Sequence, residues 1–521
     1  MDAFKDMKPA NMDAAEREMC LPGTRVDVLQ DIFLSLVNPT AEKNILWLRG
    51  PAGSGKSTIL NTLAHDFLQL CRRGAFLFWD RDKPDNSDPS RVIHTLAYQL
   101  ARFDADFARE LDTQLKARPS IMESSLDLQF QYLLQKPLTT LSERRDYGPV
   151  IIVLDALDEC GTLESRGKLL KTLSTGLKKL PKTFRILIAS RDEPDIRDAM
   201  SHLNPDMRDA PMGDESTSLD IQLLFQKELS SNADAFLGYR LPPYEEIVRK
   251  LVILSGGLFI WASTTIRFIK SGPPAERLRK VLSASAHSRS QSRLDDLYRV
   301  ALTHPFEPYD ENEIQDVHSI LGAIVVAREQ LTDEQLSWLL ELEIGIVQAA
   351  LSRLQPLLQG GHGRPVRVLH ASFIDFLERC EDSKWRIITY DHHLGLASHC
   401  LRVMGNGLKF NICAIETSYY RNKDIGGIQE RVDRAISPAL MYASQYWADH
   451  LESGSVQELG SHPLVDAIRD FFFHRFLYWI EVFSVKEQVS AIPGILRKAT
   501  SWAKVCRHFS HDDNIGLILP P

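Results

Sequence analysis

The chain has 521 residues, a length that suggests three or four domains at about 150 residues each. Hydrophobic residues make up 44% and charged residues 25%, which excludes a globally disordered or fibrous protein. The 61 Lys and Arg residues against 69 Asp and Glu residues give a net charge of −8. A mildly acidic chain without a long run of Lys or Arg argues against nucleic acid as the main partner.

The cysteines and the apolar stretches indicate where the protein resides. The seven cysteines are scattered and form neither a CxxC pair nor a metal-type spacing, which is typical of free thiols in a reducing compartment. Residues 1–20 lack an apolar signal core. The stretch 251–266 is uncharged but about four residues too short to span a membrane. We therefore expect a cytoplasmic protein without a membrane partner.

Strand-like and helix-like patterns alternate from about residue 44 to residue 210. Apolar runs predict buried strands at 44–49, 75–79, 150–154 and 185–189. Apolar residues at helical spacing predict helices at 56–73, 92–107, 126–141 and 166–179. Continuous apolar strands interleaved with helices predict an α/β fold, with a parallel sheet covered by helices on both faces.

The strand-like runs become rare beyond residue 216. Helices are expected at 244–269, with a break at Gly256 and Gly257, and at 293–301. Between 312 and 379 the pattern reads as three helices, a glycine-rich hairpin and a further helix, which is typical of a winged helix. Thr332 and Gln335 predict a capping box that opens a helix at 333–342. Residues 385–521 are rich in aromatic residues and mostly helical in pattern.

Residues 50–57, GPAGSGKS, match the pattern G-x-x-x-x-G-K-[ST] between a predicted strand and a predicted helix. In such a phosphate-binding loop (P-loop), small residues let backbone N–H groups surround phosphates, and the helix N-terminus adds positive potential. Lys56 supplies a charge for the β- and γ-phosphates, and the Ser57 hydroxyl can ligate Mg²⁺. A plain glycine-rich turn is the alternative, which the lysine, the hydroxyl and the flanking elements disfavour. The predicted nucleotide-binding residues are Gly50, Pro51, Ala52, Gly53, Ser54, Gly55, Lys56, Ser57 and Thr58.

An acidic motif, LDALDE, follows the strand predicted at 150–154. Asp155 lies where this strand ends, at the sheet edge where ligands bind in α/β folds, and is suited to hold Mg²⁺. Asp158 and Glu159 can orient or deprotonate a water that attacks the γ-phosphate. The alternative is an acidic surface turn, which the upstream P-loop disfavours.

Two further residues are candidates in this context. Arg191 follows the strand at 185–189, where a guanidinium can stabilise or sense the γ-phosphate. An arginine after a strand is common, so this interpretation depends on the P-loop. His370 follows the hairpin, and either packs beside Phe373 or contacts the phosphates of the nucleotide.

Eight motifs together resemble the NACHT family of STAND P-loop NTPases, in its large fungal branch with a nephrocystin-like N-terminal type. The motifs are CLPGTR at 20–25, GPAGSGKST at 50–58, LDALDEC at 154–160, IASR at 188–191, SGGLFIWAS at 255–263, LDDLY at 294–298, HASFIDFL at 370–377 and ISPALMYASQYWADHL at 436–451.

The resemblance implies a P-loop NTPase core, followed by a helical lid, a winged helix and a helical C-terminal region. The expected boundaries are a lead-in at 1–43, the core at 44–215, the lid at 216–305, the winged helix at 306–384 and the C-terminal region at 385–521. The family implies that the winged helix closes over ADP, and that exchange for ATP opens the lid and permits self-oligomerisation.

Site roles also follow from the resemblance by position. Lys56 and Ser57 correspond to the phosphate and magnesium residues, and Asp155 to the magnesium carboxylate. The remaining expected roles are hydrolytic acids for Asp158 and Glu159, the sensor arginine for Arg191, the ADP latch for His370 and proximity to adenine for residues 20–25.

These patterns predict a nucleotide-controlled signalling switch that binds ATP or ADP with Mg²⁺ and hydrolyses ATP slowly. The alternatives are a P-loop ATPase whose turnover drives work, a phosphotransferase and a nucleotide-binding scaffold without catalysis. A DNA-binding regulator is disfavoured, because the recognition region at 344–354 contains a single cation, Arg353. The chain shows no repeat array after the winged helix, so neither the sensed signal nor the effector partner can be named.

Overall fold

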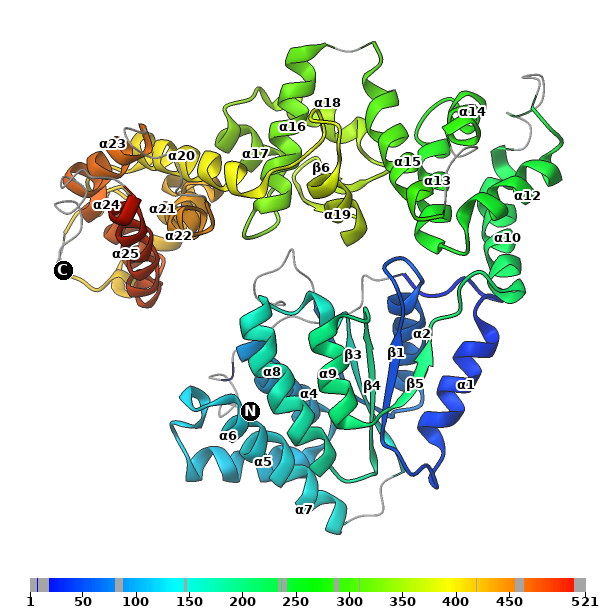
Figure 1. Cartoon of the computed structure of the whole chain (residues 1–521). Helices are drawn as coiled ribbons and strands as arrows, with labels where there is room; N and C mark the ends of the chain where they lie inside the picture. Colours follow the sequence, from blue (N-terminus) through cyan, green and yellow to red (C-terminus); the bar gives the residue numbers. More distant parts are fainter. Residues whose placement is uncertain are drawn as a thin grey trace. The chain divides into compact units, whose positions relative to one another are not determined.

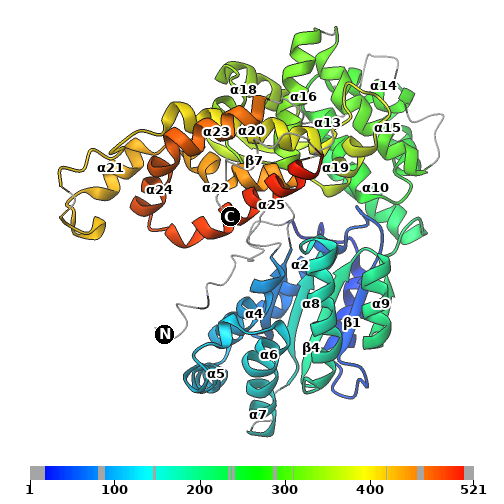
Figure 2. The same cartoon turned by 60° about the vertical axis from the view of Figure 1, so that its left-hand side comes forward.

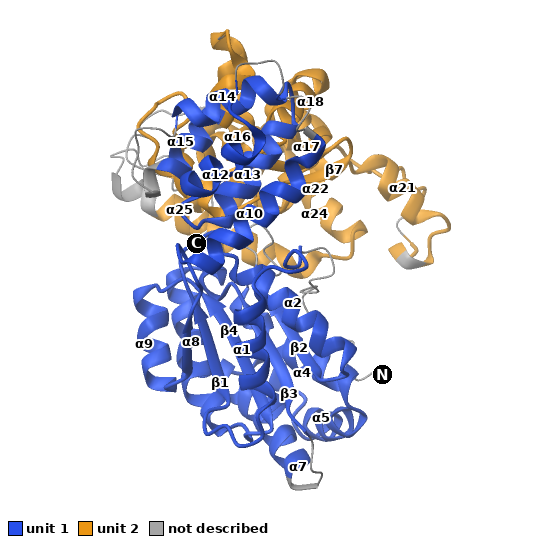
Figure 3. Cartoon of the chain, turned by 90° about the vertical axis from the view of Figure 1, so that its right-hand side faces the viewer, with its two compact units in different colours: residues 1–300 blue, residues 301–521 orange. Residues whose placement is uncertain are grey.

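The computed structural model describes Met7 and residues 18–79, 88–144, 148–232, 236, 241–284, 290–308, 310–417, 419–454 and 463–509. The chain divides into two compact units, residues 1–300 and 301–521 (Figure 3). The predicted lead-in at 1–43 lies outside the described residues except for Met7 and the part from residue 18 onward.

A five-stranded parallel sheet with the strand order β2-β3-β4-β1-β5 forms the centre of the first unit (Figure 1). The strands are β1 (Ile45–Arg49), β2 (Arg73–Phe78), β3 (Val150–Asp155), β4 (Phe184–Ser190) and β5 (Asp206–Asp209). Every residue of β3 and β4 is buried, because helices cover both faces of the sheet. The predicted fold class is confirmed.

Successive strand residues face opposite sides of the sheet and so build two separate cores. Leu46 and Leu48 pack in a core with α1 (Val26–Val37) and α2 (Lys56–Gln69). On the other face, Trp47 packs in a core to which four helices of ten or more residues contribute. These are α4 (Val92–Phe103), α5 (Ala105–Ala117), α8 (Leu163–Gly176) and α9 (Pro194–Leu203). The connection from α5 to β3 contains α6 (Leu126–Gln129) and α7 (Lys136–Arg144).

Three local predictions differ from the structure. The helix expected to reach residue 73 ends at Gln69, since Arg73 already belongs to β2. The helix expected at 92–107 is two helices, because the Asp104 carboxylate caps α5 by accepting from the backbone N–H groups of Asp106 and Phe107 at 2.7 and 2.9 Å. The edge strand β5 was not predicted, because its four residues are polar except for Met207 and alternate in exposure.

After the sheet, the described residues form α10 (Glu215–Leu229), α12 (Tyr244–Ser255), α13 (Phe259–Lys270), α14 (Pro274–Ala284) and α15 (Ser290–Thr303). The predicted break at Gly256 and Gly257 separates α12 from α13, and both glycines have positive φ. A Cβ on Gly257 would lie 2.4 Å from the backbone nitrogen of Gly213. The turn between α12 and α13 therefore lies directly against the connection from β5 to α10.

The second unit begins with the element order predicted for a winged helix. It contains α16 (Glu311–Val326), α17 (Asp333–Leu340), α18 (Ile344–Arg353), a hairpin of β6 (Leu358–Gly361) and β7 (Arg364–Val368), and α19 (Ala371–Arg379). The predicted capping box is confirmed, because Thr332 and Gln335 each bond the backbone N–H of the other, at 3.2 and 2.9 Å. The helix ends at Leu340, two residues early, since Glu341 is left-handed.

The C-terminal region is helical in its described part. Its helices are α20 (Thr389–Gly407), α21 (Ile428–Ala435), α22 (Pro438–Ser453), α23 (Pro463–Asp470), α24 (Phe476–Val485) and α25 (Ile492–Phe509). Helix α22 packs against α20 and α25 (Figure 2). In the described part of the chain, no helix combines the length and the apolar character needed to cross a bilayer.

Candidate functional site

The nine predicted loop residues, 50–58, connect β1 to α2 as one turn, with Lys56, Ser57 and Thr58 in the first helical turn. Gly53 and Gly55 have φ angles of +78° and +88°, which glycine adopts without steric cost. Gly53 is also approached by α13, since its carbonyl accepts from the Ile260 N–H at 3.3 Å. A Cβ on Gly53 would lie 2.0 Å from Ile260 Cγ2. The P-loop and α13 are therefore in direct contact.

Lys56 lies at the centre of a cluster of charged residues. Its Nζ donates to the carbonyls of Gly50 and Pro51 at 2.8 and 2.9 Å. Burial lowers the pKa of Lys56, while the carboxylates of Asp158, Asp155 and Glu159 raise it, and Arg191 lowers it. Charges act on one another more strongly the closer they lie. The structure thus brings together every charged side chain that was predicted for the site at 50–191.

Ser57 and Asp155 come from different elements and meet at the sheet edge. Ser57 Oγ donates to Asp155 Oδ1 at 3.2 Å. Asp155 is the last residue of β3 and is 1% exposed. A hydroxyl and a carboxylate oxygen side by side fit the oxygen ligands that Mg²⁺ prefers. Among the described residues no group of three or more His, Cys, Asp or Glu side chains could hold a metal, so Mg²⁺ here would take its other ligands from phosphate and water.

Asp158 and Arg191 form an ion pair at the same edge. Asp158 follows β3 after Ala156, whose φ of +59° turns the chain sharply. The Asp158 carboxylate accepts from the backbone N–H of Arg191 at 3.0 Å and from its Nε at 3.2 Å. The adjacent Glu159 is half-buried. Asp158 is thus tied to the end of β4, and the hydrolytic roles of Asp158 and Glu159 remain predictions.

Sequence reasoning missed Arg166, which holds this acidic turn in place. Arg166 is 4% exposed and donates to the backbone carbonyl of Asp158 at 2.6 Å. It also forms ion pairs with Glu193 and Asp195 at the start of α9, at 2.6 and 2.8 Å. A signal was present in the sequence, because Arg166 shares a helical stripe with Leu169, Leu170 and Leu173. A charge on an apolar stripe requires buried partners.

Ser190 and Trp47 form a second contact that sequence reasoning missed. Ser190 ends β4 and is fully buried, and its Oγ accepts from Trp47 Nε1 at 2.9 Å. The indole belongs to the neighbouring strand β1, so it fixes the hydroxyl at the carboxyl edge of the sheet. An indole N–H needs such a partner when it is buried.

His370 belongs to the second unit and caps α19 there. Its Nδ1 lies 3.1 Å from the backbone N–H of Ser372, from which it accepts, and 2.7 Å from Ser372 Oγ. This contact gives the ring a local role in the helix start. The predicted role as an ADP latch remains a prediction.

Arg353, the cation of the predicted recognition region, is engaged within the second unit. It pairs with Glu313 at 2.6 Å, and its guanidinium lies 5.3 Å from the centroid of the Phe306 ring. A phosphate contact by this side chain would require breaking the ion pair.

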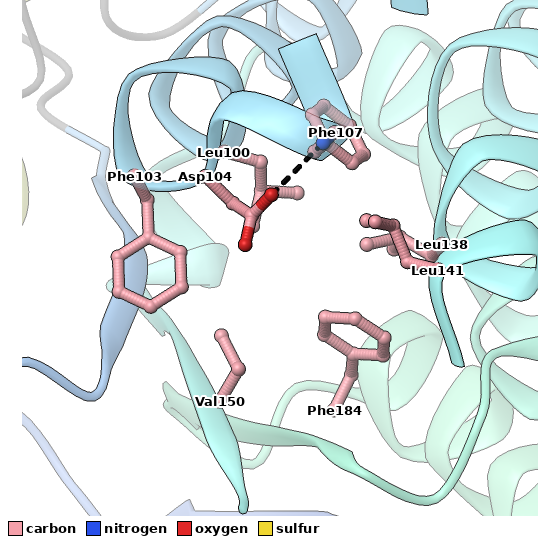
Figure 4. A pocket seen from close by; sticks show the side chains of 8 residues that line it. All are labelled: Leu100, Phe103, Asp104, Phe107, Leu138, Leu141, Val150 and Phe184. Carbon is pink, nitrogen blue, oxygen red and sulfur yellow. Dashed lines mark hydrogen bonds between the residues drawn. The ribbon is translucent and has the colours of Figure 1, made fainter. Parts of the chain in front are cut away.

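A small apolar pocket lies at the amino ends of β3 and β4, where Val150 and Phe184 line it (Figure 4). The other lining side chains are Leu100, Phe103, Asp104, Phe107, Leu138 and Leu141. Asp104 caps α5 there, so the pocket offers no set of converging polar groups. A specific ligand site has such groups, and the P-loop edge is the better candidate.

Comparison with known families identifies the type of the first domain. Residues 23–191 match the family described as Nephrocystin 3, N-terminal. Residues 23–191 are therefore similar to a nephrocystin-3 N-terminal type domain, as the sequence motifs predicted, while the fungal lineage remains a prediction. No curated protein matches the chain.

Forty chains of solved structures match. One is a signal transduction ATPase with numerous domains (STAND) with a tetratricopeptide repeat sensor from Pyrococcus horikoshii, at 13% identity and a TM-score of 0.41, covering 95% of this chain. The chain spans 65% of that structure's length. Another is Cdc6p from Pyrobaculum aerophilum, at 14% identity and a TM-score of 0.30, covering 74% of this chain and 89% of that one. At these values neither structure is informative about activity.

The first unit thus combines the P-loop motif with a parallel sheet and the nephrocystin-3 N-terminal match, and this combination implies nucleotide binding.

Proposed function

We propose that this chain is a nucleotide-controlled signalling switch, which binds ATP or ADP with Mg²⁺ at the P-loop and hydrolyses ATP slowly. The observation that carries the proposal is the convergence of the Ser57–Asp155 hydrogen bond and the Lys56 charge cluster beneath α13. Residues that bind phosphate and metal thereby lie next to a helix that can respond to them.

Each residue has a defined part in nucleotide binding. The N–H groups of 50–58 and the N-terminus of α2 would surround the phosphates. Lys56 Nζ would exchange the carbonyls of Gly50 and Pro51 for phosphate oxygens. Ser57 and Asp155 would hold Mg²⁺, which when bound neutralises phosphate charge.

Slow hydrolysis follows from how the acidic side chains are held. Glu159 would orient or deprotonate the attacking water. Asp158 is paired with Arg191, so this ion pair must loosen before Arg191 can reach a γ-phosphate. A residue that must first leave a partner is poorly preorganised for the transition state. We therefore expect retention of nucleotide rather than rapid turnover.

Switching requires the nucleotide to change contacts between parts of the chain. Because Ile260 of α13 contacts Gly53, a change in the shape of the P-loop would move or release α13. In the proposal, the helices at 216–305 act as a lid, His370 latches ADP, and exchange for ATP permits self-oligomerisation and contact with an effector. The full domain boundaries predicted above belong to this proposal.

The test is to denature the purified chain, identify the released nucleotide by chromatography, and measure turnover on the native protein. The proposal predicts co-purified ADP and a turnover below about 1 s⁻¹. Rapid turnover without retained nucleotide would instead favour an ATPase that drives work, and a phosphorylated acceptor would favour a phosphotransferase.

A further inference from the structure

Arg25 joins four separate segments of the first unit. Its guanidinium donates to the carbonyl of Ser54 in the P-loop at 3.0 Å. It also donates to the carbonyl of Pro211, after β5, and to Thr217 Oγ1 on α10, both at 3.0 Å. The same guanidinium lies 4.5 Å from the centroid of the Phe259 ring, at the start of α13. One side chain therefore touches the P-loop and both helices next to it.

The contact with Ser54 fixes an N–H group of the P-loop. A trans peptide is planar, so its C=O and N–H point in nearly opposite directions. When Arg25 holds the Ser54 carbonyl on its own side of the loop, the N–H of Gly55 in the same peptide must point to the other side. Gly55 has a φ of +88° and immediately precedes α2, where the N–H groups of such a loop surround phosphate.

Burial makes this arrangement specific for arginine. Arg25 is 5% exposed, and its own backbone is fixed because its N–H donates to Asp220 Oδ2 at 3.0 Å. Its φ of +58° is left-handed, a conformation that is unfavourable for a non-glycine residue. The two terminal nitrogens of the planar guanidinium donate to three acceptors at once, those on Ser54, Pro211 and Thr217. The single ammonium group of a lysine cannot reproduce this geometry.

We propose that Arg25 is a positioning residue for the nucleotide, which presets the Gly55 N–H for phosphate binding and ties that setting to α10 and α13. The proposal rests on nucleotide binding at the P-loop, as proposed above. Arg25 acts through the P-loop peptide and not by touching the reacting atoms.

The test compares Arg25→Lys with a matched control, Arg185→Lys. Arg185 is 3% exposed and also donates to backbone carbonyls, those of Asn38, Ala41 and Lys43, but it lies near the amino end of β4. Both variants lose a buried guanidinium, and circular dichroism would establish that they are folded. Calorimetry with ADP should show affinity about tenfold weaker for Arg25→Lys, as for a lost hydrogen bond to a charged group, and unchanged affinity for Arg185→Lys.

A second readout requires no nucleotide. Hydrogen exchange of residues 255–263, which contain the Ile260 N–H bonded to Gly53, should be faster in Arg25→Lys than in the wild type and unchanged in Arg185→Lys. Should Arg25→Lys not fold, Thr217→Val removes one acceptor on α10 and should shift both readouts in the same direction.

The outcomes separate the two proposals. A wild-type chain that binds no nucleotide contradicts the proposed function, while the exchange measurement still tests the coupling to α13. A wild-type chain that binds ADP, with Arg25→Lys equal to it in affinity and in exchange, overturns the role of Arg25. Equal weakening in both arginine variants also overturns it, because the effect would then be one of general stability.

Discussion

Buried charged side chains define the candidate site at the scale of single residues. Asp155 and Asp158 are 1% and 4% exposed and lie beside Lys56 and Arg191. Burying a charge is costly unless it is paired or hydrogen-bonded; Asp158 pairs with Arg191, and Asp155 accepts a hydrogen bond from Ser57. The Ala156 backbone, left-handed at a non-glycine residue, adds local strain of the kind that clusters at functional sites.

Glu159 is expected to act in hydrolysis and not in binding. Glu159→Gln removes the base while preserving the shape of the side chain, so ATP affinity should be unchanged and single-turnover hydrolysis should slow by about 100-fold or more. Glu164→Gln serves as the control, because Glu164 is exposed on α8 and pairs with Lys168. Hydrolysis by Glu159→Gln at the wild-type rate would remove this residue from the catalytic assignment.

The motifs predicted the site residues that lie close in sequence to a strand end, whereas long-range partners could not be predicted. The P-loop and the LDALDE segment carry residue types and spacings tied to phosphate chemistry. Arg25 contacts Thr217, which is 192 residues away, and no local pattern specifies such a pair. Arg166 could have been found from its place on an apolar stripe.

At the scale of elements, the carboxyl ends of β1, β3 and β4 bring the site together. The apolar runs of these strands were predicted because their buried residues are continuous. The edge strand β5 was not predicted, because it lacks a continuous apolar run. Its residues are mostly polar and alternate between half-buried and exposed. The contact of α13 with the P-loop joins residues that lie far apart in the sequence. Local sequence patterns could not predict it.

Gly53→Ala tests the contact between the P-loop and α13. The added Cβ would lie 2.0 Å from Ile260 Cγ2, on a residue with a φ of +78°. We expect the free energy of unfolding to fall by about 1–3 kcal/mol, with weaker ADP binding. Gly167→Ala is the control, since this exposed glycine of α8 has open space around it. Denaturant unfolding that shows no loss for Gly53→Ala would contradict the contact.

At the scale of the whole molecule, the chain separates into a unit that carries the P-loop, residues 1–300, and a second unit, residues 301–521. The second unit contains a pair of histidines in contact, of which His450 is buried and His393 half-buried. His393 Nδ1 lies 2.8 Å from His450 Nδ1, and His450 Nε2 lies 2.9 Å from the Tyr442 hydroxyl. One proton can bridge the two imidazoles, but a second would place two donors against each other.

Acidification should therefore destabilise the second unit. Burial, together with the charge of nearby Arg328, lowers the pKa of His393 to about 4. Burial, His393 and Arg328 together hold the pKa of His450 well below its usual 6.5. The unfolded chain takes up protons below pH 6.5 while the folded unit does not, so stability falls as the pH drops from about 6.5 to 4.

Thermal unfolding measured between pH 7.5 and 5 checks this expectation. The Tm of the wild type should decrease toward pH 5. The Tm of His393→Gln should decrease less, because one of the two histidines is then missing. The pH dependence of the Tm should be the same in His474→Gln as in the wild type, since the side chain of His474 is exposed. A pH-independent Tm in this range would show that the histidine pair does not stay neutral in the folded unit.

The central claim is that a nucleotide binds in the loop at 50–58, with Lys56 as its main cation. The most direct measurement is calorimetric titration of Lys56→Ala with ADP and Mg·ATP, beside the wild type and Lys168→Ala, which changes an exposed lysine of α8. Loss of a charged hydrogen-bond donor to phosphate should weaken binding by about 10- to 100-fold, while Lys168→Ala should bind like the wild type. Undiminished affinity in Lys56→Ala would place the nucleotide elsewhere and contradict the account.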